Sequence, residues 1–299
     1  MLLSLAALIL TVPADDWARP PPLAELGVWS TDLIDRDGLS RFRFVTRATF
    51  SDGESPFSGA SAWAYEARVH VRLLQGVALS AVVPVGLVLG HGDNRLLFGN
   101  VAAGVTVGGK IADAGDFRLR IGGGFDTYAP TSSGDPEAAA ELGLVASLRS
   151  YETQLFIPQT LSFRFRAFVE ASQDRFTFSA EAGLVPAISL ARREQGVTTL
   201  FAGAIRANMA VSAFFEPYIE VGGSTALGGV GDVHPPLMFT PGARFHIADV
   251  FDPAVFVTFN FVAGSAIMFG VDLASVTRPM HQKRDRMRIR PEDSPSLDF

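Results

Sequence analysis

Cysteine is absent from the sequence, and lysine occurs only as Lys110 and Lys283. Without a thiol the chain can hold no disulfide, no thiolate nucleophile and no cysteine-ligated metal. Because lysine is so rare, arginine carries nearly all of the positive charge. The net charge of -6 argues against a nucleic-acid partner, which a basic surface would recognise.

Long apolar runs are also missing, although the composition is apolar. Hydrophobic residues make up 48% of the chain, and the mean hydropathy is +0.25. Even so, no stretch after residue 14 has the ~18 or more uncharged apolar residues that a transmembrane helix needs. An apolar chain without helical spans leaves two fold classes, a large soluble β-fold and a membrane β-barrel.

The first residues have the pattern of a signal peptide. An apolar core over residues 2–10 ends at Val12-Pro13-Ala14, and two aspartates follow. This arrangement predicts cleavage after Ala14, so that residues 1–14 are removed on export. The core lacks the usual preceding basic residue, and a buried N-terminal helix is the alternative. The polar, proline-rich residues 15–40 are expected to form a periplasmic lead-in.

Alternation of apolar and polar residues is the strongest pattern in the chain. In Trp63–Leu73 the odd positions are apolar, whereas Glu66, Arg68 and Arg72 occupy even positions. Since successive side chains of a strand point to opposite faces, one face of this strand is apolar and the other is charged. The same pattern, strong or weak, predicts twelve strands: Phe42–Phe50, Trp63–Leu73, Val77–Leu87, Leu97–Lys110, Phe117–Phe125, Leu161–Ala171, Phe176–Leu184, Thr199–Ala207, Phe215–Gly223, Leu237–Phe245, Pro253–Phe261 and Ala266–Leu273.

The connections between these segments alternate in length. Short turns are expected at 74–76, 111–116, 172–174, 208–212 and 247–251, and longer loops at 52–60, 89–94, 128–159, 187–197, 224–236 and 262–265. Bacterial outer-membrane barrels have short periplasmic turns, longer outer loops and an even number of strands. A closed sheet also leaves no strand edge unpaired, which a hydrocarbon surrounding requires.

Aromatic residues on the predicted outward faces complete the pattern: Trp63, Tyr65, Phe117, Phe125, Phe163, Phe176, Phe215, Phe245 and Phe269. Over residues 41–274 the chain resembles the bacterial outer-membrane β-barrel proteins, and porins in particular. The resemblance implies an all-β fold, a transmembrane antiparallel up-and-down barrel, in the outer membrane of a Gram-negative bacterium, with both termini periplasmic. It also implies contact with outer-membrane lipid, lipopolysaccharide and the assembly machinery, but it indicates no substrate.

Two further segments lie outside the alternating pattern. Asp135 and Pro136 suit the N-cap and first position of a helix, and apolar residues then recur on one face, so loop 128–159 is expected to contain a short helix. This helix could fold into the lumen or cover the outer mouth. The arginine-rich tail, 275–299, is expected to be a disordered periplasmic segment.

None of the short motifs that resemble ligand sites is complete. Gly104–Lys110 lacks the Ser or Thr of a phosphate-binding loop because Ile111 follows, and Gly122–Gly124 lacks the spacing of a dinucleotide site. These glycines are expected in the barrel wall, where glycine relieves crowding or permits a bend. The aspartates of Asp32–Asp37 lack the glutamate of a calcium loop, and the histidines lack metal-ligand spacing. No cofactor and no metal are therefore expected.

His70 and Ser80 could belong to a hydrolase. If the hairpin turn centres on Gln75, His70 faces Ser80, and Glu66 lies further along the same face. However, Glu66 is about 13 Å from His70 along a strand, and no oxyanion donor is evident. We therefore expect a hydrogen-bonded His70 in a polar lumen and no enzyme. An outer-membrane lipid hydrolase is an alternative, which a loss of lipid release in Ser80→Ala would support.

The polar faces converge on the inside of the predicted barrel, and their charges form the candidate site. Basic residues dominate the first strands and acidic residues the later ones: Arg41, Arg43, Arg47, Glu66, Arg68, His70, Arg72, Arg118, Arg120, Arg164, Arg166, Glu170, Glu181, Arg206, Glu216, Glu220 and Arg244. Clusters of charge are how pores select ions. We expect a channel for passive passage of small hydrophilic, anionic solutes. The alternative is a closed structural or adhesive barrel, in which these charges pair and fill the lumen.

Overall fold

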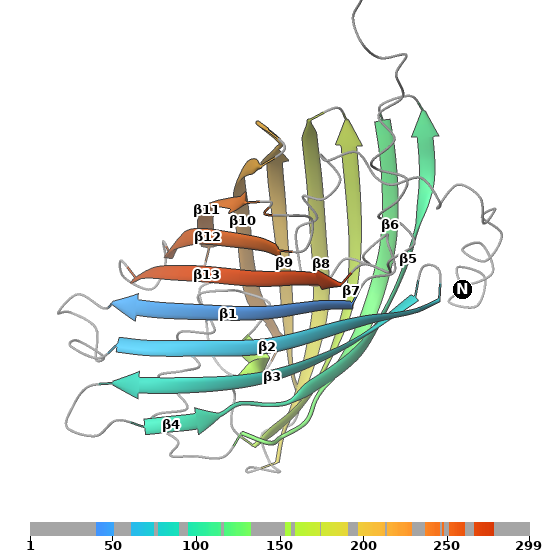
Figure 1. Ribbon diagram of the computed structural model, residues 1–299. Helices are drawn as coiled ribbons and strands as arrows, with labels where there is room; N and C mark the ends of the chain where they lie inside the picture. Colours follow the sequence, from blue (N-terminus) through green and yellow to red (C-terminus); the bar gives the residue numbers. More distant parts are fainter. Residues whose placement is uncertain are drawn as a thin grey trace, which may run out of the picture.

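The computed structural model describes residues 40–277 except for gaps at 51–60, 75–76, 90–94, 115–116, 133–152, 157–158, 174, 191–196, 213, 229–236, 246, 248–250 and 261–265 (Figure 1). Nearly all described residues lie in strands: β1 (Ser40–Phe50), β2 (Ser61–Leu74), β3 (Val77–Leu89), β4 (Arg95–Phe98), β5 (Ala102–Ala114), β6 (Phe117–Tyr128), β7 (Thr160–Gln173), β8 (Phe176–Ser189), β9 (Val197–Met209), β10 (Phe215–Gly228), β11 (Leu237–Phe245), β12 (Phe251–Asn260) and β13 (Ala266–Thr277). A short 3-10 helix, η3 (Thr153–Leu155), precedes β7. In this described part of the chain, no helix is long and apolar enough to cross a membrane.

The strands form one antiparallel sheet that returns on itself. β1 pairs with β2 on one side and with β13 on the other, and β2 pairs with β3. β4 and β5 lie one after the other along β3, so together they fill one position of the ring. From β5 to β13 each strand pairs with the next, which gives twelve positions in an up-and-down barrel (Figure 1). Each of the long strands thus has a neighbour on both sides, whereas the short β4 pairs with β3 alone.

The alternation in the sequence separates two faces of the wall. In β7 every second residue from Thr160 to Ser172 is buried, and the residues between are half-buried or exposed. The buried residues include Arg164 and Arg166, whereas the exposed ones include Phe165 and Val169. The wall is therefore polar inside and apolar outside, as in membrane barrels and opposite to a soluble protein.

Large apolar side chains are exposed on the outer face of the described strands. They occur from β2 to β13, for example Leu79, Phe98, Phe117, Phe165, Phe178, Leu184, Ile205, Ile219, Val255 and Phe269. Soluble monomers rarely expose apolar surface on this scale, and such a surface marks contact with a membrane or a partner.

All twelve predicted strands are present, but several extend further than predicted. β5 continues to Ala114, into the predicted turn 111–116, and β10 continues to Gly228. β13 continues to Thr277, so its last residues fall in the segment predicted as a disordered tail. The reason is that alternation fades where side chains no longer face hydrocarbon, whereas main-chain pairing in a closed sheet continues.

Prolines account for the interruptions in the sheet. Leu97–Lys110, predicted as one strand, is broken between β4 and β5, opposite Pro84 of β3. The β7–β8 pairing skips the positions beside Pro186, and the β11–β12 pairing skips those beside Pro241. Proline has no N–H to donate, so the ladder fails on the side that its nitrogen faces.

Some wall glycines lie under aromatic rings of an adjacent strand, as two pairs illustrate. Phe168 covers Gly122 and Phe256 covers Gly270, and each pair is directly opposed in the sheet. A Cβ at either glycine would collide with the ring. The predicted role of the glycines in relieving crowding is thus confirmed at Gly122.

Several predictions concern residues outside the described ranges. They are the signal peptide 1–14, the lead-in up to residue 39, the helix within loop 128–159 and the tail beyond residue 277. These stay predictions.

Candidate functional site: the inner wall of the barrel

Most of the predicted lumen residues are buried side chains on the inner face of the wall. They are Glu66, Arg68, Arg120, Arg164, Arg166, Glu170, Glu181, Arg206, Glu216, Glu220 and Arg244. Arg118 is half-buried. The alternation of the strands places them on one face because each lies an even number of residues from its charged neighbours in the same strand.

The remaining predicted residues, Arg41, Arg43, Arg47, His70 and Arg72, lie in β1 and β2, and the description of these five is limited to their backbone. Their register is nevertheless clear. Arg41 is opposite His70, Arg43 is opposite Arg68, and Arg47 is opposite Ala64.

Cross-strand ion pairs connect the buried charges of β6, β7 and β8. Arg120 Nη1 donates to Glu170 Oε1 at 3.1 Å, between directly opposed residues of β6 and β7. Arg164 of β7 pairs diagonally with Glu181 of β8. Charged side chains with so little access to water are tolerated because each has an opposite charge in contact.

A second group of contacts lies in the later strands. The Arg206 guanidinium carbon lies 3.4 Å from the ring centroid of Tyr218, a cation–π contact between β9 and β10. Asn208 Nδ2 donates to Glu216 Oε1 at 2.7 Å. These contacts hold arginine and carboxylate groups against the wall between β9 and β10.

Asp126 is a charged residue that the predicted set of site residues did not include. It is buried, and Arg166 Nε donates to its Oδ2 at 3.0 Å. The sequence did indicate its position, because Asp126, like Arg118 and Arg120, occupies an even position and therefore the same strand face. It lies one residue beyond the predicted strand Phe117–Phe125.

The buried charges of the described wall are balanced. Six arginines (Arg68, Arg120, Arg164, Arg166, Arg206 and Arg244) face six carboxylates (Glu66, Asp126, Glu170, Glu181, Glu216 and Glu220). Four further arginines belong to β1 and β2, and their register places them near Glu66 of β2 and Asp272 of β13, both opposite Val45.

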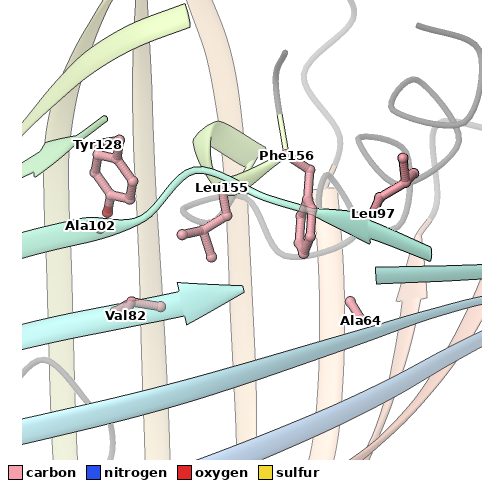
Figure 2. Close-up of a cluster of buried hydrophobic side chains, with 7 residues drawn as sticks. All are labelled: Ala64, Val82, Leu97, Ala102, Tyr128, Leu155 and Phe156. Atoms are coloured by element: carbon pink, nitrogen blue, oxygen red, sulfur yellow. The ribbon is translucent and has the colours of Figure 1, made fainter. Parts of the chain in front are cut away.

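A short piece of the long β6–β7 connection lies inside the barrel. Leu155 and Phe156 are 1% exposed and pack with Ala64, Val82, Leu97, Ala102 and Tyr128 on the inner face of β2 to β6 (Figure 2). This part of the inner wall is apolar, in contrast to the charged wall beside it. The inward position was one of the two alternatives for this loop.

The inward piece is fixed to the break between β4 and β5. The Asn100 backbone N–H donates to Leu155 O at 2.6 Å, and Asn100 Nδ2 donates to Gln154 O at 2.9 Å. Asn100 Oδ1 in turn accepts from the Ser132 N–H at 3.0 Å. The interruption caused by Pro84 therefore frees main-chain groups that hold both ends of the loop.

The predicted pairing of His70 with Ser80 is confirmed by the β2–β3 register. The Glu66 carboxylate accepts from Arg68 Nη2 at 2.9 Å. Among the described residues, no group of three or more His, Asp or Glu side chains is arranged to hold a metal ion. The inner wall is thus built from charged and hydrogen-bonding groups.

Comparisons with known proteins establish the fold. No protein-family model matches the chain, and no curated protein matches it significantly. Its structure is similar to an outer-membrane channel from Pseudomonas putida F1, at a TM-score of 0.60 and 9% identity, covering 84% of this chain and 100% of that one. The KdgM porin in complex with disordered oligogalacturonate matches at a TM-score of 0.46 and 8% identity, covering 79% and 98%. The fold is that of the outer-membrane β-barrels.

Proposed function

We propose that this protein is an outer-membrane channel for the passive passage of small hydrophilic solutes, with a preference for anions. The observation that carries the proposal is the inverted wall, with exposed Phe165 and Ile205 outside and charged Arg120 and Glu170 inside. An apolar outer face suits lipid, and a wall of charges suits a solute path through the membrane.

The anion preference rests on β1 and β2. Across the wall, one row of opposed residues reads Arg68, Arg43, Ala274 and Asp252, so two arginines are direct neighbours. Arg68 pairs with Glu66 of its own strand, and Arg120 and Arg164 pair with carboxylates of adjacent strands. We place the field that attracts anions on the β1–β2 side of the lumen, where Arg43 and Arg68 are adjacent.

The same proposal gives the chain an orientation. Residues 1–14 are removed on export, both termini lie in the periplasm, and the long β6–β7 connection faces the outside. Outer-membrane lipid, lipopolysaccharide and the assembly machinery are the partners.

Planar-bilayer recording tests the channel. The purified protein should conduct, and Arg43→Glu or Arg68→Glu should shift the reversal potential toward that of cations, with Arg68→Gln giving a smaller shift. Arg175→Glu, at an exposed turn residue, is the matched control and should have little effect in ~1 M salt, where the Debye length is ~3 Å. A protein that inserts but never conducts above the lipid background would refute the proposal.

One observation favours a second candidate, a closed barrel with a structural or adhesive role. The lumen charges are buried and paired, and Leu155 and Phe156 fill part of the inner space. A closed barrel would remain silent in the bilayer experiment even after Phe156→Ala, which removes a large inward apolar side chain. A channel with a narrow lumen would conduct more after that substitution.

A further inference from the structure

Arg166 lies flat against the wall and reaches across three strands. From β7 its Nε donates to Asp126 of β6 at 3.0 Å, and its Nη2 donates to Thr106 Oγ1 of β5 at 2.5 Å. The side chain is 0% exposed. The Arg166 guanidinium thus lies along the wall, over β6 and against β5.

The register explains how this is possible. Thr106, Gly124 and Arg166 are directly opposed across β5, β6 and β7, so Arg166 reaches Thr106 only by passing over Gly124. In the next inner row, Gly104 is opposite Asp126. The Arg166 side chain therefore lies over Gly124, and the Asp126 side chain lies over Gly104.

Neither glycine can be replaced without moving the pair. A Cβ on Gly124 would lie 2.8 Å from Cζ and Nε of Arg166 and 2.9 Å from Nη2. A Cβ on Gly104 would overlap the Asp126 carboxylate. Real Cβ atoms essentially never make contacts under 3.0 Å, so a methyl group at either position displaces a charged group. We expect the displaced group to move toward the lumen.

We propose that Gly104 and Gly124 form a recess that sets the width and charge of the lumen. The recess keeps the Arg166 guanidinium beside Asp126 and Thr106, so that it neither narrows the path nor presents its charge to a passing anion. These glycines are positioning residues that act through Arg166. The inference rests on the proposed channel function, and it names the residues that tune that function.

The test combines current recording with chemical modification of the full-length, membrane-inserted protein. Gly124→Ala should lower the single-channel conductance and shift the reversal potential further toward that of anions. The added substitution Arg166→Gln should abolish both effects. Gly203→Ala is the matched control, since Gly203 is on the outer face of β9 and its Cβ would approach only the adjacent wall, at 3.2 Å from Glu181 O. Gly104→Ala serves as the second variant if Gly124→Ala fails to fold.

Phenylglyoxal, which modifies accessible guanidinium groups, gives a readout independent of conduction. Mass spectrometry should find Arg166 protected in the wild-type protein and modified in Gly124→Ala. Protection of Arg166 in both proteins, with unchanged conductance, would overturn the inference. If the wild-type protein carries no current, the channel proposal fails, and the modification result alone decides on the recess: modification supports it and protection rejects it.

Discussion

At the scale of single residues, the inner wall depends on charges that have been removed from water. Arg120 and Glu170 illustrate this, because they are directly opposed, 3.1 Å apart at their closest atoms and both buried. Removing one partner of a buried ion pair leaves the other charge without compensation, which costs far more than the pair contributes when intact. The inner wall is therefore stable only when each buried charge lies beside an opposite charge.

We predict that Glu170→Gln and Arg120→Gln each lower the free energy of unfolding by about 3–5 kcal/mol, the cost typical of breaking a buried ion pair. The double variant Arg120→Met/Glu170→Leu should recover most of this loss, because no uncompensated charge remains. Urea unfolding in lipid vesicles measures the difference, with Arg175→Gln at the exposed turn as control. Equal losses for the single and double variants would mean that the two side chains contribute by packing rather than by charge pairing.

At the scale of strands, proline determines where the wall is continuous. The seam between β11 and β12 has five directly paired residues. Every other seam between two full-length strands of the described ring has nine or more, and only the pairings of β3 with the short β4 and with β5 are comparably short. Pro241 of β11 interrupts its middle, and Pro253 lies just beyond its last pair. Thr240 and Thr258 bridge the interruption on the inner side through their hydroxyl groups, 2.8 Å apart.

We predict that amide hydrogens along the β11–β12 seam exchange faster than those along β8–β9, where the pairing is continuous from Phe176 to Ile188. Local opening requires fewer hydrogen bonds to break at the interrupted seam. Pro241→Val restores one main-chain N–H donor at the β11–β12 seam and should slow amide exchange in β12. Pro217→Val, just before the first β9–β10 residue pair, is the control and should leave exchange in β12 unchanged. Hydrogen–deuterium exchange with mass spectrometry measures both, and equal rates at the two seams would contradict the prediction.

At the scale of the whole molecule, the ring of twelve strand positions inverts the usual distribution of polarity. Charges are inside and large apolar side chains are outside, so only a hydrocarbon surrounding stabilises the arrangement. Closure is what makes this possible, because most main-chain groups of the wall pair with a neighbouring strand.

We predict that Ile205→Arg, on the outer face of β9, destabilises the barrel in lipid by about 2–4 kcal/mol, as expected for arginine near the middle of a bilayer. Phe176→Arg, on the first residue of β8, should cost only about 0–1 kcal/mol because that strand end lies near the interface. Urea titration of both variants in vesicles gives the comparison. The same cost at both positions would argue against a membrane surrounding.

The alternating sequence by itself determined the strands, their two faces and the parity of the inner charges. Arg68, Arg120 and Glu181 could be assigned to one face because period-two alternation is a local property of an extended chain. The pairing of His70 with Ser80 was also predictable, since a tight turn dictates the register of its hairpin. Strand ends such as Ala114 and Thr277 were not, because pairing in a closed sheet continues after the hydrophobic pattern ends.

Only the tertiary structure decided which charges meet. Arg166 binds Asp126 and Thr106, which lie 40 and 60 residues away in the sequence, and a side chain reaches them only because Gly124 leaves space between. The docking of Phe156 against the inner wall at the Pro84 interruption is likewise a long-range contact. Such contacts depend on the relative register of several strands and on the space between their side chains. Neither the strand register nor the space between side chains can be read from a local sequence pattern. These contacts are therefore defined only by the complete ring of strands.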